Sequence, residues 1–83
     1  MNQLAANLAR IAVTVDLSST DFTTSNPSGL AVYVGGSGNV KVDTISGSTG
    51  ITFTTPVVGQ ILPVLVSKIY KTGTTATGLV ALS

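Results

Sequence analysis

The sequence predicts an all-β fold, a compact antiparallel β-sandwich or barrel of about six short strands with a short N-terminal helical or extended arm. Three observations support this prediction. Apolar and polar residues alternate along most of the chain, as they do in half-buried strands. Turn-forming stretches of Gly, Ser, Asn and Pro recur at short intervals. Val, Ile and Thr, which suit a pleated surface, dominate the composition together with Leu, Ala, Ser and Gly.

The chain divides into an arm, residues 1–10, and a single β domain, residues 11–83. In the arm, Leu4, Leu8 and Ile11 recur at the spacing of one helix face, and Asn2 is placed to cap the first turn. Two helical turns are marginal alone in water. We therefore expect the arm to order against a neighbour, with a frayed terminus as the alternative.

The first strand is expected over residues 11–17, where Ile, Val and Leu occupy every second position. Residues 18–29 are polar and end in an Asn-Pro-Ser-Gly turn signal. Phe22 is the one large apolar residue in this loop, so we expect it to pin the loop to the core.

Residues 30–34 and 40–45 alternate on either side of a Gly-rich segment, residues 35–39. This pattern predicts a β-hairpin. A turn at 46–49 then leads to a strand over residues 50–54, which ends before the Thr-Pro pair that follows.

Residues 60–71 are the longest strand candidate. Pro63 cannot donate to a ladder, so it marks a strand start, an edge or a bulge. The apolar alternation changes face between Val66 and Ile69, which indicates a bulge or a strand that bends from one sheet to the next. A turn at 72–77 leads to the last strand, residues 79–82.

The composition removes most routes to catalysis. The chain has no histidine and no cysteine, so imidazole bases, thiol nucleophiles and soft metal ligands are absent. Asp16, Asp21 and Asp43 lack the spacing of a calcium loop, and we expect them to be solvated or paired with lysine, with a local Asx-type bond open to Asp21. The glycines at 35–38 precede a strand pattern rather than a helix, which favours a turn over a phosphate loop. We expect no enzyme, cofactor or metal site.

Size and charge favour self-association. The chain has a mass of 8.3 kDa, a net charge of +1 and a mean hydropathy of +0.53. So small a core is marginal, and without disulfides or a metal the remaining remedy is oligomerisation. Four scattered cations make nucleic acid a poor partner. No apolar run is long enough to span a membrane, and the first residues lack a signal-peptide pattern, so synthesis in the cytoplasm is expected.

The candidate interface residues are two leucines of the arm, the isoleucine that directly follows it, and two tyrosines. Leu4, Leu8 and Ile11 form the apolar face of the arm, whereas Tyr33 and Tyr70 lie opposite the main apolar stripes of their strands. An aromatic ring on an outer surface is a good interface anchor. The alternative is an aromatic platform that stacks on sugars or bases.

Four sequence elements together resemble one known family. They are Tyr-Val-Gly-Gly-Ser-Gly-Asn-Val at 33–40, Ile-Thr-Phe at 51–53, Gly-Gln-Ile-Leu-Pro-Val-Leu-Val at 59–66 and Thr-Gly-Thr-Thr-Ala-Thr-Gly at 72–78. In order and spacing they resemble the small head spike base proteins of tailed phages and gene transfer agents.

The resemblance implies a virion protein on the capsid exterior, made in the cytoplasm of a bacterial host. Such a protein forms a ring, a pentamer at the fivefold vertex with a trimer as the alternative, on the major capsid protein, and seats a spike or fibre protein. The family supplies no catalytic residue. Two other functions remain open at this point: a capsid decoration (cement) protein, and a carbohydrate- or receptor-binding module that uses Tyr33 and Tyr70.

Overall fold

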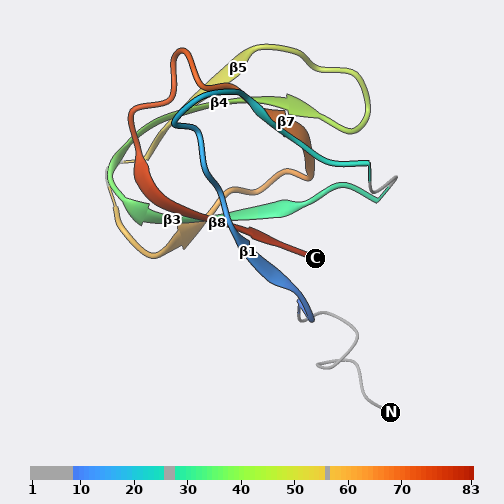
Figure 1. Ribbon diagram of the computed structural model, residues 1–83, viewed down its shortest axis with the longest axis horizontal. Coiled ribbons are helices and arrows are strands. Elements are labelled where there is room, and N and C mark those ends of the chain that lie inside the picture. Colours follow the sequence, from blue (N-terminus) through green and yellow to red (C-terminus); the bar gives the residue numbers. More distant parts are fainter. Residues whose placement is uncertain (1–8, 26–27, 56) are drawn as a thin grey trace.

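Two four-stranded antiparallel sheets pack face to face in this protein (Figure 1). The structure, a computed structural model, describes residues 9–25, 28–55 and 57–83. Sheet A has the order β1-β8-β3-β6 and sheet B the order β2-β7-β4-β5. The strands are β1 (Ala12–Thr14), β2 (Phe22–Thr23), β3 (Ala31–Gly36), β4 (Gly38–Thr44), β5 (Ile51–Thr55), β6 (Gln60–Ile61), β7 (Val66–Ile69) and β8 (Thr77–Leu82). The all-β prediction is confirmed, and the architecture is a sandwich rather than a barrel.

The core lies between the sheets and follows the alternation of the sequence. Val32 and Val34 in β3 and Val40 and Val42 in β4 are buried, and the residue between each pair faces outward. Phe22, in β2, lies opposite Ile69 and packs against the core, so the prediction that it pins its loop is confirmed. The buried apolar residues are Leu30, Val32, Val34, Val40, Val42, Leu62, Val66, Ile69, Ala76, Leu79 and Ala81.

The segment predicted as one strand, residues 60–71, passes from one sheet to the other. Its first part is β6, at the edge of sheet A, and its second part is β7, inside sheet B. The N–H of Leu62 still donates to Val32 O (3.0 Å), and Val66 then pairs with Leu30 before β7 continues along β4. Pro63 lies in the crossing, where no ladder bond is required of it. The change of face between Val66 and Ile69 lies inside β7, where the register against β4 shifts between Asp43 and Thr44, so it marks a β-bulge that follows the change of sheet.

The β-hairpin predicted around residues 35–39 is wrong. β3 pairs with β8 and β6, whereas β4 pairs with β5 and β7. β3 stays paired with β8 up to Gly36, and β4 is paired with β5 from Gly38 onward. The chain therefore crosses from sheet A to sheet B at Ser37. Gly38 has a φ of +148°, and a Cβ added there would lie 2.6 Å from the backbone nitrogen of Ala76. A glycine lets the corner pass this close to neighbouring backbone.

The described residues form eight strands rather than about six, because two-residue strands form in segments expected to be loop or single strand. β2 lies within the predicted loop 18–29. The predicted strand 11–17 is reduced to β1, and Val15 and Leu17 beyond it still pack against the core. The arm, residues 1–10, lies largely outside the described residues, and β1 runs out from the sandwich at its start (Figure 1).

Threonine hydroxyls replace a strand partner where β7 ends. The N–H groups of Asn39 and Lys41 donate to the side chains of Thr75 (2.9 Å) and Thr74 (3.0 Å). In return, the N–H groups of Thr75 and Ala76 donate to Asn39 O at 2.8 and 3.1 Å. The loop after β7 therefore satisfies the backbone of β4 without forming a strand.

Candidate interaction surfaces

The outward face of sheet A is uncharged across all four strands. Residues that lie directly opposite one another share a face of the sheet. The register places Thr14, Val80, Tyr33 and Ile61 in one outward row, and Ala12, Leu82 and Ala31 in the next. Tyr33 is 37% exposed and Ile61 53%. We call these residues the sheet A outer face: Ala12, Thr14, Ala31, Tyr33, Ile61, Val80 and Leu82.

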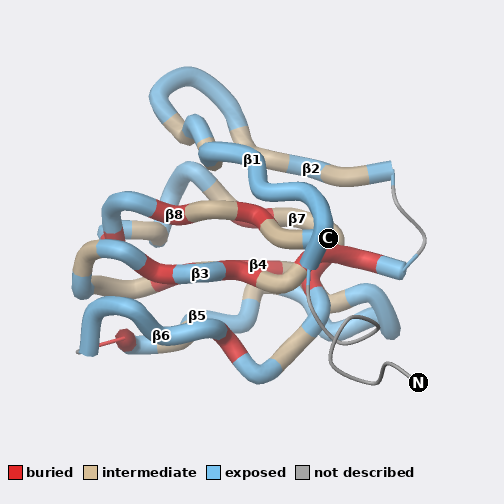
Figure 2. Tube along the Cα trace, turned by 90° about the horizontal axis from the view of Figure 1, so that it is seen from below, coloured by how far each residue is buried: buried red, intermediate tan, exposed pale blue. Residues whose placement is uncertain are grey.

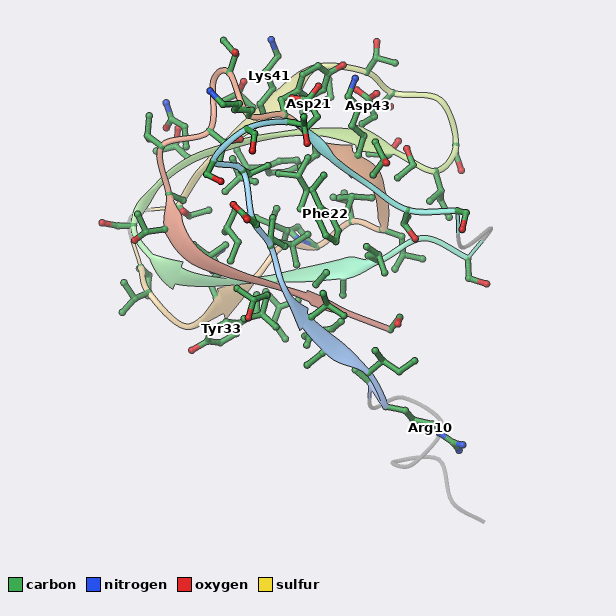
Figure 3. All side chains as sticks on the ribbon, in the orientation of Figure 1. Arg10, Asp21, Phe22, Tyr33, Lys41 and Asp43 are labelled. Carbon is green, nitrogen blue, oxygen red and sulfur yellow. The ribbon has the colours of Figure 1, made fainter. Side chains whose placement is uncertain are left out.

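Five of the seven charged side chains gather on the opposite side of the molecule, and the other two, Arg10 and Asp16, flank β1. Lys41 and Asp43 lie on β4 and Lys68 on β7, and Asp21 and Lys71 flank the same sheet. Figure 3 shows Lys41, Asp21 and Asp43 beyond sheet B, whereas Tyr33 lies beyond sheet A. The sandwich therefore has one ionic face and one apolar face, and the two differ in what they can contact.

A hydrogen-bonded cluster on sheet B is centred on Asp43. Its Oδ1 accepts the backbone N–H of Gly50 (2.8 Å) and the hydroxyl of Tyr70 (2.7 Å). These bonds hold the pKa of Asp43 below its usual value, and the bond to Asp43 raises the pKa of Tyr70. The ammonium groups of Lys68 and Lys41 lie 4.6 and 5.0 Å from the centroid of the Tyr70 ring. The Tyr70 side chain is therefore held by three neighbours, Asp43, Lys68 and Lys41.

Asp21 ties the chain before β2 to the end of β7. Its Oδ1 accepts the N–H of Lys71 (2.7 Å), and its Oδ2 lies 3.3 Å from Lys68 Nζ. The bond from Lys71 is the main cause that lowers the pKa of Asp21, and Asp21 in turn raises the pKa of Lys68. The local Asx-type bond considered for Asp21 occurs instead at Asp16, which accepts the N–H of Ser18 (2.9 Å).

The five predicted interface residues have different surroundings. Leu4 and Leu8 lie outside the described residues. Ile11, just before β1, is 59% exposed. Tyr33 stands on the sheet A outer face, and Tyr70 is half-buried in the cluster around Asp43. Tyr33 and Tyr70 therefore lie on opposite faces of the sandwich and do not form a common aromatic platform.

Sequence reasoning missed a second apolar surface, at the edge formed by β5 and β6. Four exposed aliphatic residues lie there, Ile51, Val57, Val58 and Ile61, and we call them the β5–β6 side. A signal for this surface was present in the sequence, because residues 44–67 contain no charged side chain. An uncharged segment that includes an edge strand is unusual, since natural edges are commonly protected by charge.

Acid is expected to weaken the fold through Asp43. The pKa of Asp43 is lower in the folded state than in the unfolded state. Its carboxylate therefore stabilises the fold at a pH above the unfolded-state pKa. This stabilisation is lost below about pH 4, as the pH falls through the folded-state pKa. Asp43→Asn should therefore flatten the decline of the urea midpoint on acidification. Asp16→Asn is the control, since its bond to Ser18 spans two residues and persists more easily in the unfolded chain. Equal pH profiles for the two variants would contradict this account.

The described residues offer little else for chemistry. Among them, no three carboxylate-type metal ligands come together, and no helix is long and apolar enough to cross a membrane. One open hollow of about 370 Å³ is lined by hydroxyl and aliphatic side chains, namely Thr44, Ile45, Ser46, Ser48, Val64 and Leu65. Comparisons with protein-family models, with curated proteins and with solved structures find no significant match for this chain.

Proposed function

We propose that this chain is a non-enzymatic virion structural protein that oligomerises on the outer surface of a phage-type capsid, as the base of a vertex spike or fibre. The structural observation that carries the proposal is the two-faced sandwich. One broad face is uncharged across four strands, and five of the seven charged side chains lie on the other. The sequence resemblance over residues 30–83 supplies the capsid as the partner.

Three of the four segments that carry the resemblance lie where the chain passes between the sheets, and the fourth, residues 51–53, lies in β5. Residues 33–40 contain the corner from β3 to β4, and residues 59–66 contain the crossing from β6 to β7. Residues 72–78 form the loop that bonds to β4 and lead into β8. These are positions that decide the path of the chain. The resemblance therefore supports a shared sandwich and not a shared chemical site.

The sheet A outer face is the surface assigned to the capsid shell. Apolar area removed from water stabilises a contact by about 25 cal/mol per Å². Tyr33, at the centre of its row and 37% exposed, supplies an aromatic anchor of the kind that dominates interfaces. A ring of several copies would repeat this contact and add avidity. The ionic face of sheet B then points away from the shell, toward solvent and the spike or fibre protein.

Tyr33→Lys is expected to weaken attachment to particles of the major capsid protein by about tenfold or more, because an unpaired ammonium would be buried against the shell. Co-sedimentation of the purified protein with these particles measures it. Thr49→Lys adds the same charge at an exposed position in the turn before β5, away from the sheet A outer face, and should bind like the wild type. Unchanged binding of the Tyr33 variant would contradict the assignment of this face.

The copy number per particle separates the spike base from a decoration (cement) protein. A vertex base is present in far fewer copies than the major capsid protein, whereas a decoration protein approaches it. Quantitative mass spectrometry of purified particles measures this ratio. A carbohydrate- or receptor-binding module has less support, because Tyr70 is engaged with Asp43 and leaves Tyr33 as a single ring for stacking.

A further inference from the structure

Two inward-facing rows of the sandwich end in exposed aliphatic side chains. In sheet A the row through Val32 and Ala81, both buried, ends at Val13, which is 46% exposed. In sheet B the row through Val42, also buried, ends at Ile51, which is 42% exposed. Both side chains belong to the layer between the sheets by register, yet no described strand covers them. The apolar layer is thus open at two places.

The two open places lie on opposite sides of the sandwich. β1 and β6 are the two edges of sheet A, and β2 and β5 are the two edges of sheet B. Figure 2 shows β1 and β2 together on one side and β5 and β6 together on the other. We call Ile11 and Val13 the β1 side, which faces away from the β5–β6 side defined above. One copy of the chain cannot close both openings with its own strands.

From this geometry we infer that the β1 side of one copy packs on the β5–β6 side of the next, so that the apolar layer continues from copy to copy. This inference rests on the proposed oligomer and names its subunit contact. The occupant of each open side is a second copy of this chain, because the matching surface is present on the same molecule. Both contact surfaces are aliphatic, so no like charges oppose each other when they meet.

The contact is head-to-tail, because two different surfaces meet in it. Repeated head-to-tail contacts close into a ring when the rotation between copies closes. An interface of standard size buries about 800 Å² per partner, which is about one sixth of the 4989 Å² surface of this chain. Two such contacts per copy leave the sheet A outer face, apart from Ile61, and the ionic face of sheet B free. The edges thus join copies, and the broad faces remain available for other partners.

Charge placed on either side tests the inference by light scattering on the purified protein. We expect Val13→Lys and Ile51→Lys each to reduce the mass from a multiple of 8.3 kDa to 8.3 kDa, because every contact then contains one altered side. When the two variants are mixed, the intact β5–β6 side of one and the intact β1 side of the other should form a dimer of twice the chain mass. Ile11→Lys provides a second variant of the β1 side if Val13→Lys fails to fold.

Leu65→Lys is the matched control. Leu65 is 47% exposed, a fraction similar to that of Val13. It lies between β6 and β7 beside the hollow, and belongs neither to the β1 side nor to the β5–β6 side. It should retain the wild-type mass. A monomeric wild type, unchanged assembly of both variants, disruption by only one of them, or a mixture that stays monomeric would each overturn the inference. Capsid binding is scored separately with Tyr33→Lys, so failure of the subunit contact and failure of the proposed function remain distinguishable.

Discussion

Replacing Ile69 with alanine is expected to lower the free energy of unfolding by about 2–5 kcal/mol, the range for large-to-small changes in a core. Ile69 has no exposed surface and is the largest fully buried side chain. It lies between Phe22 and Val42 in the register of sheet B, so its loss opens a cavity next to both strands. A domain of this length is typically stable by about 4–12 kcal/mol. The change should therefore remove much of the stability.

Urea denaturation followed by circular dichroism measures the effect. Ile45→Ala is the control, because it deletes the same atoms from a side chain that is 40% exposed, at the end of β4. We expect it to cost clearly less than Ile69→Ala, since less of its surface is covered by neighbours. Similar losses for the two variants would mean that the core does not lie between the two sheets as described.

Gly38→Ala is expected to destabilise the protein by at least about 2 kcal/mol, because it adds both backbone strain and a steric clash. The φ of Gly38 is +148°, and the new Cβ would lie 2.6 Å from Ala76 N and 2.8 Å from Ala76 Cα. These are backbone atoms of a segment that is itself bonded to Asn39, so the neighbour cannot move away easily. The corner between β3 and β4 should be forced open.

Gly47→Ala separates strain from clash in the same denaturation experiment. Gly47 also has a positive φ, +111°, but a Cβ there meets nothing within 4 Å. Gly47→Ala should lower the free energy of unfolding by the backbone strain alone, about 1 kcal/mol. If Gly38→Ala costs no more than Gly47→Ala, the close approach of the corner to Ala76 does not constrain the fold.

Most of the strands could be predicted from the alternation of apolar and polar residues. Val32 and Val34, and again Val40 and Val42, predict strands with one buried face, and each pair is fully buried. The change of face before Ile69 predicted a bulge or a passage between sheets; the structure has the bulge within β7 and the passage just before it. These successes have one cause, since a side-chain period of two fixes which residues of a strand can be buried together.

The alternation of residues predicts a strand but does not predict which strand pairs with it, as the Gly-rich loop between β3 and β4 shows. A Gly-rich loop between two alternating strands suits both a hairpin and a corner that joins two sheets. The choice depends on β8 and β7, strands far along the chain that pair with β3 and β4. The sequence around residues 35–39 does not show which strands pair with β3 and β4. The prediction therefore found both strands and assigned them to each other.

The candidate surfaces were predictable only in part. The register of β3 exposes Tyr33 as the alternation indicated, but Tyr70 is bound to Asp43, a residue 27 positions away. No spacing rule links the two, because they meet through the pairing of β4 with β7. The β5–β6 side required knowledge of which strands end each sheet. Its lack of charge was visible in the sequence, but its place at an edge was not.

The mass of the purified wild-type protein in solution, measured by sedimentation equilibrium over a range of concentrations, tests the central claim most directly. If this chain completes its apolar layer with neighbouring copies, we expect a defined multiple of 8.3 kDa that persists at high salt, because the contacts are aliphatic. A folded species of 8.3 kDa at every concentration would contradict the account.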